Sequence, residues 1–412
     1  MIERIEIVRA ATAEFSTQSI AGTINIVLKK KVSLAQRQIR ASYSRGSFFT
    51  SPSADFLVSD KVGNFSYTVS GYVYQNTNNY PYSNIEVGVD AAGRQILLRE
   101  FTGLSEGNGK GGGHEPRLNW TLANGDTLGW QLFVNTNTGS GSNASRYKMT
   151  QGIPAPFQTL FSTNEYTAND FRTDVNWVKK SKESAKLDMK LGFNLNRNDN
   201  SFNVHSFNAA NQQTQDRTPS TSAKNKGLTF TGKYSTPIVE GHSLVSGWGT
   251  SVGQRDKTSN QRDLAFANIS PPTPAFISDD NFEARVVKLS AFAQDEWNVT
   301  KLLSVYLGLR WESLITTTEG KTFSAGSNRS SVWSPLKQTL YKLLGRQGEQ
   351  MRLALTRTYK APSTSQLIPR LFRSIANKPT SPDSRGNPDL QPELATGIDI
   401  ALEKFEGGKV RR

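Results

Sequence analysis

The sequence predicts an all-β, up-and-down antiparallel transmembrane β-barrel, on three observations. Apolar and polar residues alternate with a period of two, short connections alternate with long polar ones, and tryptophans lie beside the short connections. The period of two places alternate side chains on opposite faces of a strand. Short turns at one end and long loops at the other are typical of outer-membrane barrels.

The alternation is clearest in 187–195 and 303–312. The odd positions read Leu, Met, Leu, Phe, Leu in the first segment and Leu, Val, Leu, Leu, Trp in the second, whereas the even positions are mostly polar or glycine. The odd positions are therefore predicted to face lipid. The same pattern occurs in 65–74, 117–122, 128–135, 171–178, 228–234, 287–297, 351–356 and 398–403. The ambiguous stretch 337–344 is assigned to a strand because of its neighbours.

The connections between these segments fall into two classes. The short ones lie near 61–64, 123–126, 179–184, 237–241, 298–302 and 345–350. The long ones are predicted at 77–113, 138–165, 199–225, 257–282, 317–330 and 361–392, and they are rich in Asn, Ser, Thr, Gly and Pro. This division gives about fourteen strands, most of them near the 9–11 residues that a tilted spanning strand needs.

A soluble β-sandwich or propeller also alternates, but its strands average about 5–6 residues. No blade-length repeat is visible. Trp130, Trp177 and Trp297 lie next to predicted short turns, and tryptophan collects at bilayer interfaces. The membrane barrel is therefore favoured.

The composition argues against several classes of enzyme, metal site and nucleic-acid-binding protein. The 412 residues carry a net charge of +14, no cysteine, and three histidines that are far apart in the sequence. These counts argue against a thiolate metal site, a zinc hydrolase and a Ser-His-Asp enzyme, so we expect no catalytic residue, no metal site and no cofactor. The basic residues are scattered and no nucleic-acid-binding spacing occurs, so no nucleic-acid partner is expected. A basic lumen would favour anionic ligands.

The first thirty residues do not follow the barrel pattern. Two strands, 2–9 and 20–29, flank the compact segment between them, and the first barrel strand is predicted near 36–45. Five aliphatic residues suggest that the two strands form a small, internally packed sheet: Ile5, Ile7, Ile24, Ile26 and Leu28.

The string IERIEIVRAATAEFSTQSIAGTINIVLKKK resembles the end of the plug domain of TonB-dependent outer-membrane receptors. The matching positions are Glu3, Arg4, Glu6, Arg9, Ala13, Gly22, Asn25, Lys29 and Lys30. Three later strings are also similar to strings of this family: AFAQDEWNVTKLLSVYLGLRWE, RLALTRTYKAPS and NPDLQPELATGIDIALE. They occur in the family's order along the whole chain.

The resemblance implies residues 1–32 as the C-terminal end of a plug domain and residues 33–412 as a transmembrane β-barrel truncated at its C-terminus. The family barrel has about 22 strands, so the rest of the plug with its TonB box would precede the chain and further strands would follow it. The implied function is ligand-gated, energy-coupled import of a scarce nutrient, above all an iron–siderophore complex. The implied location is the outer membrane of a Gram-negative bacterium. The implied partners are outer-membrane lipid, the TonB protein and a small metal-chelate or other nutrient ligand.

The resemblance also implies how the plug is held, because plug arginines of this motif pair with glutamates on the barrel wall. Arg9 is the plug residue here, and Glu296 and Glu393 are the candidate partners. Alternation places both glutamates on the inward face of their strands. An unpaired charge inside the barrel would be costly.

Two other classes stay open from the residues themselves: a passive porin or oligosaccharide channel, and a surface-exposed adhesive β protein. The plug-like strings argue against a porin. The residues that bind the substrate are not identified by any recognisable pattern. Aromatic residues of the predicted long loops are equally consistent with ligand contact and with packing among themselves: Tyr80, Tyr82, Phe157, Phe161, Phe266 and Phe276.

Overall fold

The protein forms one large antiparallel sheet of 16 strands in its described residues. A computed structural model describes residues 2–8, 10–18, 23–28, 35–152, 157–181, 184–267, 272, 274–343, 348–372, 374, 382–406 and 409–411. A separate two-stranded sheet pairs β1 (Ile2–Val8) with β2 (Thr23–Leu28). The one described helix is a single turn, α1 (Thr364–Leu367), and β17 (Leu371–Phe372) pairs with β18 (Ser384–Arg385). No described helix is long and apolar enough to cross a bilayer.

Consecutive strands of the large sheet are mostly neighbours, as an up-and-down topology requires. The strands are β3 (Gln36–Arg45), β4 (Phe49–Val62), β5 (Phe65–Val89), β6 (Gln95–Thr121), β7 (Thr127–Gln151), β8 (Thr159–Lys180), β9 (Lys186–Phe207), β10 (Gln213–Arg217), β11 (Ser220–Pro237), β12 (His242–Asp263), β13 (Phe276–Asn298), β14 (Leu303–Gly320), β15 (Phe323–Lys342), β16 (Glu349–Lys360), β19 (Glu393–Glu406) and β20 (Lys409–Arg411). Two of the 16 are short, β10 with 5 residues and β20 with 3. The remaining 16 − 2 = 14 long strands agree with the predicted number. The strand assigned to 337–344 is confirmed as the end of β15.

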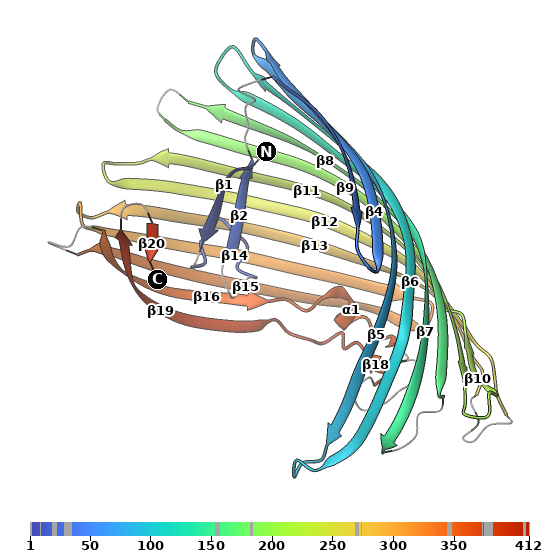
Figure 1. Cartoon of the computed structure of the whole chain (residues 1–412). Coiled ribbons are helices and arrows are strands. Elements are labelled where there is room, and N and C mark those ends of the chain that lie inside the picture. The colour runs from blue at the N-terminus through green and yellow to red at the C-terminus, as the bar shows by residue number, and fades with distance from the viewer. Residues whose placement is uncertain are drawn as a thin grey trace.

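The sheet is strongly curved, and β1 and β2 lie on its concave side (Figure 1). Within the described part of the chain, β3 and β20 stand at the two ends of the strand order, so the sheet is an open section of a barrel wall. The two longest connections between strands of the large sheet, 264–275 and 361–392, lie at one end of the strands, whereas the connections at the other end, such as 63–64, 238–241 and 299–302, are all short. We call the concave surface the inner face and the convex surface the outer face.

The strands are longer than the sequence pattern predicts, and most of the predicted long loops were wrong. β5, β6 and β7 contain 25, 27 and 25 residues, and the β5–β6 pairing runs from Phe65 opposite Trp120 to Val89 opposite Gln95. Residues 77–113 therefore form most of a hairpin. The other predicted loops at 138–165, 199–225, 257–282 and 317–330 likewise lie mostly in strands, and 361–392 is the one that stays outside the large sheet in the described residues. Polar side chains do not prevent pairing, because the ladder bonds are made by the backbone.

The predicted alternation of faces is confirmed in β14. The side chains of Tyr306, Arg310 and Glu312 contact residues 10–18 on the concave side. Leu307 and Leu309 point the other way and are 49% and 45% exposed. The apolar set therefore lies on the outer face, where a barrel meets lipid.

The small sheet of β1 and β2 forms as predicted, but the prediction that it is internally packed was wrong. Ile5, Ile24 and Ile26 are exposed. A sheet of two strands has no second layer, so neither of its faces is covered by its own residues. The side chains of Ile7 and Leu28 lie outside the described part of the structure.

Candidate functional site

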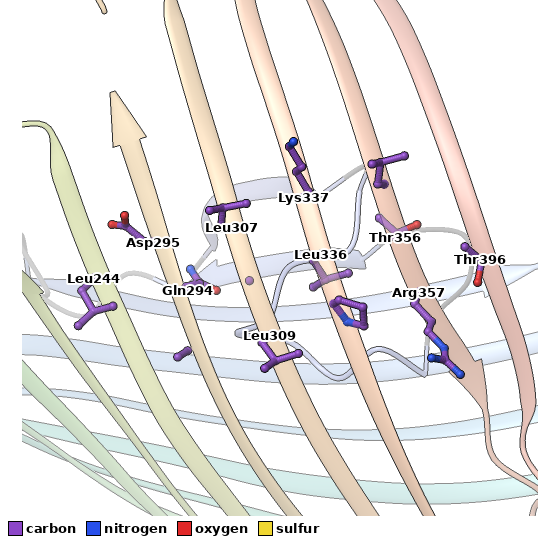
Figure 2. A pocket seen from close by; sticks show the side chains of 14 residues that line it. Leu244, Gln294, Asp295, Leu307, Leu309, Leu336, Lys337, Thr356, Arg357 and Thr396 are labelled. Carbon is purple, nitrogen blue, oxygen red and sulfur yellow. The ribbon is translucent and has the colours of Figure 1, made fainter. Parts of the chain in front are cut away.

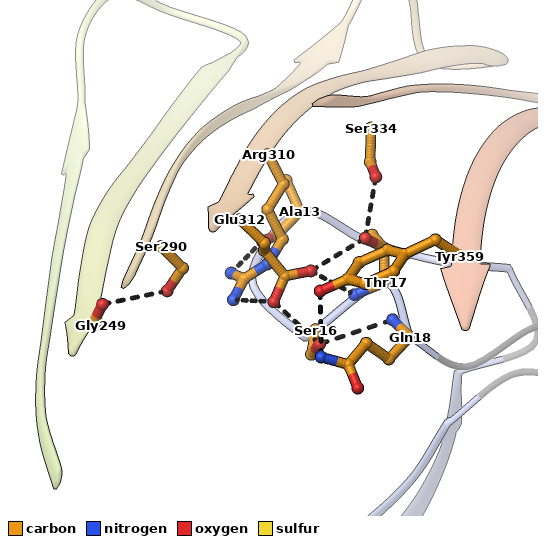
Figure 3. A network of polar contacts seen from close by, with 10 residues as sticks. All are labelled: Ala13, Ser16, Thr17, Gln18, Gly249, Ser290, Arg310, Glu312, Ser334 and Tyr359. Carbon is orange, nitrogen blue, oxygen red and sulfur yellow. Dashed lines mark hydrogen bonds and ion pairs between the residues drawn. The ribbon is translucent and has the colours of Figure 1, made fainter. Parts of the chain in front are cut away.

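Residues 10–18, which we call the docking loop, lie against the inner face of β13–β16 (Figure 3). Ala13 is completely buried and Thr17 is 1% exposed. A Cβ atom added at Gly308 of β14 would lie 3.1 Å from the Cβ of Ala13. Small residues on both sides therefore allow the loop backbone to approach the wall closely enough for direct hydrogen bonds.

Glu312 of β14 accepts three of the described hydrogen bonds from this loop, more than any other residue of the wall. One carboxylate oxygen accepts a hydrogen bond from Ser16 Oγ at 2.9 Å. The other accepts bonds from Thr17 N at 3.2 Å and Thr17 Oγ1 at 3.0 Å. The side chain is 11% exposed, so these bonds are made away from bulk water, where a charge-assisted bond is strong.

Arg310 balances the charge of Glu312. The two residues are two positions apart on one strand and therefore share a face, and Arg310 Nη2 lies 3.1 Å from Glu312 Oε1. Arg310 Nη1 donates to the carbonyl oxygen of Ala13 at 3.1 Å. Its guanidinium carbon lies 5.8 Å from the centre of the Phe292 ring, within the range of a cation–π contact. The buried guanidinium thus has a carboxylate, a loop carbonyl and an aromatic ring as partners.

Neutral side chains of β13, β14 and β15 bind the rest of the loop backbone. Tyr306 Oη accepts a bond from Ala13 N at 2.6 Å and donates to Gln294 Oε1 at 3.0 Å. Gln294 Oε1 also accepts from the backbone N–H of Glu14 at 3.0 Å. Gln338 Nε2 donates to the carbonyl of Ala11 at 3.0 Å. The bonds to Ala13, Glu14 and Ala11 go to backbone groups, so they fix the path of the loop backbone along the wall.

The last loop residues take the place of a neighbouring strand. The pairing of β15 with β16 ends at Leu336 opposite Thr356, next to Pro335, which has no N–H to donate. Beyond this point the backbone N–H of Tyr359 donates to the carbonyl of Thr17 at 2.9 Å. Thr17 Oγ1 also lies 2.8 Å from Ser334 Oγ, so the loop bridges the gap between the two strands.

The predicted Arg9 lock stays a prediction, because Arg9 lies outside the described residues. Glu296 is exposed and lies opposite Tyr306, on the inner face that the alternation predicts. Glu393 is the first residue of β19, opposite Lys360, and it is also exposed. The glutamate of the wall that the described contacts of the docking loop reach is Glu312, which sequence reasoning missed. The sequence feature that could have identified Glu312 is the charged pair Arg310 and Glu312, which lies on the polar face of a strictly alternating strand.

A second feature of the inner face is a row of tyrosines on β5, which we call the tyrosine wall: Tyr72, Tyr74 and Tyr82. Each reaches across β6 and donates a hydrogen bond to an asparagine of β7, from Tyr72 to Asn135 at 3.0 Å, from Tyr82 to Asn143 at 2.8 Å and from Tyr74 to Asn137. The rings lie over glycines of β6. A Cβ atom added at Gly113 would lie 2.8 Å from the ring of Tyr72, so only glycine leaves room for it.

The loop aromatics for which ligand contact and mutual packing were equally open do not form one group. Tyr82 belongs to the tyrosine wall and Tyr80 is 43% exposed. Phe157 is buried and its ring packs edge-to-face on Tyr147 at 5.2 Å. Packing among the aromatics thus explains Phe157, whereas the β5 tyrosines stay available on the inner face.

The connection after β16 is held against β12 and β13 by buried charged and polar groups. Arg370 Nε lies 2.8 Å from Asp280 Oδ2 of β13, and Asp280 is 1% exposed. Arg370 Nη2 also donates to Ser259 Oγ at 3.0 Å. This part of the connection is therefore held against the long ends of β12 and β13.

The sequence matches the family described as TonB dependent receptor-like, beta-barrel over residues 49–411. The chain belongs to this family. Barrels of this family lie in the outer membrane of Gram-negative bacteria, so the predicted fold and location are confirmed. No protein with a curated description matches the sequence.

Solved structures of similar fold include receptors and transporters. The ferripyoverdine receptor of the Pseudomonas aeruginosa outer membrane matches with a TM-score of 0.62 and 14% identity, over 99% of this chain and 51% of that one. The siderophore receptor PiuA from Acinetobacter baumannii matches with a TM-score of 0.56 and 13% identity, over 98% and 59%. The copper transporter OprC matches with a TM-score of 0.53 and 13% identity, over 98% and 56%. This chain therefore spans about half the length of these structures.

Proposed function

We propose that the chain acts in ligand-gated, energy-coupled import of a scarce nutrient across the outer membrane. The observation that carries the proposal is the docking loop, a non-barrel segment that is hydrogen-bonded to the inner face by Glu312, Tyr306 and Gln338. An open porin has no need for such a segment in its lumen. A segment that must be held and then released suits a gated importer.

We propose an iron–siderophore complex as the cargo. Support comes from the similar structures, two of which are named as a ferripyoverdine receptor and a siderophore receptor. Within this chain, the tyrosine wall offers aromatic ring faces and amide groups on the inner side of the barrel. Such a mixture of aromatic and polar groups is typical of small-molecule sites.

The division of the chain follows from the same proposal. Residues 1–32 act as the end of a plug domain and residues 33–412 form the barrel wall. The plug would receive energy from the TonB protein through a segment that these residues do not include. No group in this scheme acts chemically on the cargo.

Uptake of radioactive iron by iron-starved cells tests the proposal. Cells that make the receptor should accumulate iron from at least one ferric siderophore of a panel, and deletion of TonB or loss of the proton-motive force should abolish the accumulation. Uptake that persists without TonB would indicate a passive channel. Energy-dependent uptake of another nutrient, with none of iron, would retain the importer and reject the siderophore.

A further inference from the structure

A groove of about 830 Å³ lies on the outer face of β12–β16 and β19 (Figure 2). Its lining combines apolar side chains with two cations and one carboxylate: Leu307, Leu309, Leu355, Lys337, Arg357 and Asp295. The groove lies at the base of the gap where β15 and β16 stop pairing. It is separate from the docking loop, which contacts the other face of the same strands.

The register places Lys337 on the outer face. Its neighbour Gln338 donates to the docking loop and is therefore on the inner face, so Lys337 points the opposite way. Lys337 lies directly between Leu307 of β14 and Leu355 of β16 in the sheet. Both of these leucines are exposed on the outer face.

Lys337 also lies at the depth of the hydrocarbon. On the same strand and the same face, Trp333 is four residues to one side and Tyr341 four residues to the other. Tryptophan and tyrosine mark the two interfaces of a membrane barrel. A lysine between them is unfavourable unless an anionic group accompanies it, and such residues indicate functional sites.

The protein does not supply that group. Among the described residues, Lys337 and Arg357 make no ion pair. Asp295, two strands away in the row of Lys337, is already bound by His242 Nδ1 at 2.6 Å. Arg357 extends away from Lys337, toward the opposite end of the strands (Figure 2).

We propose that the groove binds a glycerophospholipid of the periplasmic leaflet. The phosphate pairs with the ammonium of Lys337, and an acyl chain lies along Leu307, Leu309 and Leu355. The leaflet follows from direction, because Lys337 extends toward the end at which β13 finishes and the short turns lie (Figure 2). In an outer-membrane barrel the short turns are periplasmic. A lipid of that leaflet has its phosphate at this end and its chains toward the midplane.

Native mass spectrometry of the detergent-purified receptor with added lipids tests this site. The probes are palmitoyl-oleoyl phosphatidylglycerol, the matching phosphatidylethanolamine, uncharged palmitoyl-oleoyl glycerol and lipid A. Lys337→Met should weaken binding of both phospholipids about tenfold, the effect of losing one charge-assisted contact. Lys337→Arg should retain it. Lys288→Met is the matched control, since Lys288 lies on the inner face of β13, opposite Leu314.

Three other outcomes would contradict the proposal. Equal binding of the uncharged lipid would mean that Lys337 recognises no phosphate. Preference for lipid A would place the site in the outer leaflet. Dimers that form without lipid and disappear with Lys337→Met would identify a second copy as the occupant. A purified Lys337→Met protein that is not heat-modifiable would be replaced by Lys337→Gln, judged by the same criteria.

Discussion

The two faces of β14 and β15 differ in the partners that they give to a charged side chain. On the inner face, Arg310 is 7% exposed and has Glu312, the Ala13 carbonyl and the Phe292 ring as partners. On the outer face, Lys337 is exposed and makes no ion pair with any described residue. Both positions obey the same alternation. The alternation thus decides which face a charge occupies, and the partner on that face decides what the charge does.

Removal of the inner partner should have the largest effect. Glu312→Gln would leave the buried Arg310 without its carboxylate and weaken the bonds to Ser16 and Thr17, at a cost of about 3–5 kcal/mol for a broken buried pair. We expect much faster hydrogen exchange of the amides of the docking loop in the purified receptor. Glu115→Gln is the control, because Glu115 is exposed on the inner face of β6, opposite Ser70 and away from the docking loop. Equal exchange in the two variants would mean that Glu312 does not hold the loop.

A charge placed on the apolar outer face should have the next largest effect. Leu307→Arg should destabilise the folded barrel by about 2–4 kcal/mol at the midplane. Thr229→Arg, on the inner face of β11 opposite Gly192, should cost little. Folding yield into lipid vesicles, read from heat-modified migration, measures both. Similar yields would contradict the assignment of faces.

The tyrosine wall offers a test of close packing away from the docking loop. Gly113→Val should displace the Tyr72 ring and cost about 1–3 kcal/mol, as other overpacked sites do. In Gly326→Ala the added carbon would meet only Thr318 Oγ1, at 3.5 Å, so this substitution should be tolerated. Urea titration of the folded barrel compares them. If Gly113→Val matched Gly326→Ala in stability, the ring would not rest on the glycine.

The smallest effect is expected at the rim of the docking loop. Lys233 Nζ lies 2.5 Å from Glu14 Oε1, and both side chains are about one-third exposed. An ion pair of this kind contributes about 0–1 kcal/mol and weakens with salt. Lys233→Met should therefore raise hydrogen exchange at Glu14 slightly at low ionic strength and not at 0.5 M salt, a concentration at which the Debye length is only about 4 Å. An effect that survives high salt would point to packing by the lysine stem.

Much of the fold could be predicted, because alternation is a direct consequence of strand geometry. Leu307, Arg310 and the start of β19 at Glu393 were all placed correctly by period and motif. The lengths of the strands were not predicted. Where the strands extend beyond the bilayer they are rich in Asn, Ser and Gly, so the sequence there shows no apolar alternation. The exposure of Ile5 was missed for a related reason: a pattern shows which residues are apolar, but not whether another layer covers them.

The docking site was only half predictable. Alternation places Glu296 and Glu312 on the same inner face, but it does not say at which height the docking loop meets the wall. That height depends on the stagger of neighbouring strands and on the path of residues 10–18, and both are properties of the folded chain. The gap after Leu336, which Thr17 bridges, depends in the same way on where β15 and β16 part.

Disulfide trapping tests the docking of this loop most directly, because the sequence contains no cysteine to interfere. The hydroxyls of Thr17 and Ser334 lie 2.8 Å apart, so Thr17→Cys with Ser334→Cys should form a disulfide readily under mild oxidation. Thr17→Cys with Ser330→Cys should not, since Ser330 lies four residues further along the same face of β15, about 13 Å away. The account predicts a cross-link in the first pair alone, with import blocked until a reductant is added. Equal cross-linking of both pairs, or full import through the cross-linked receptor, would contradict it.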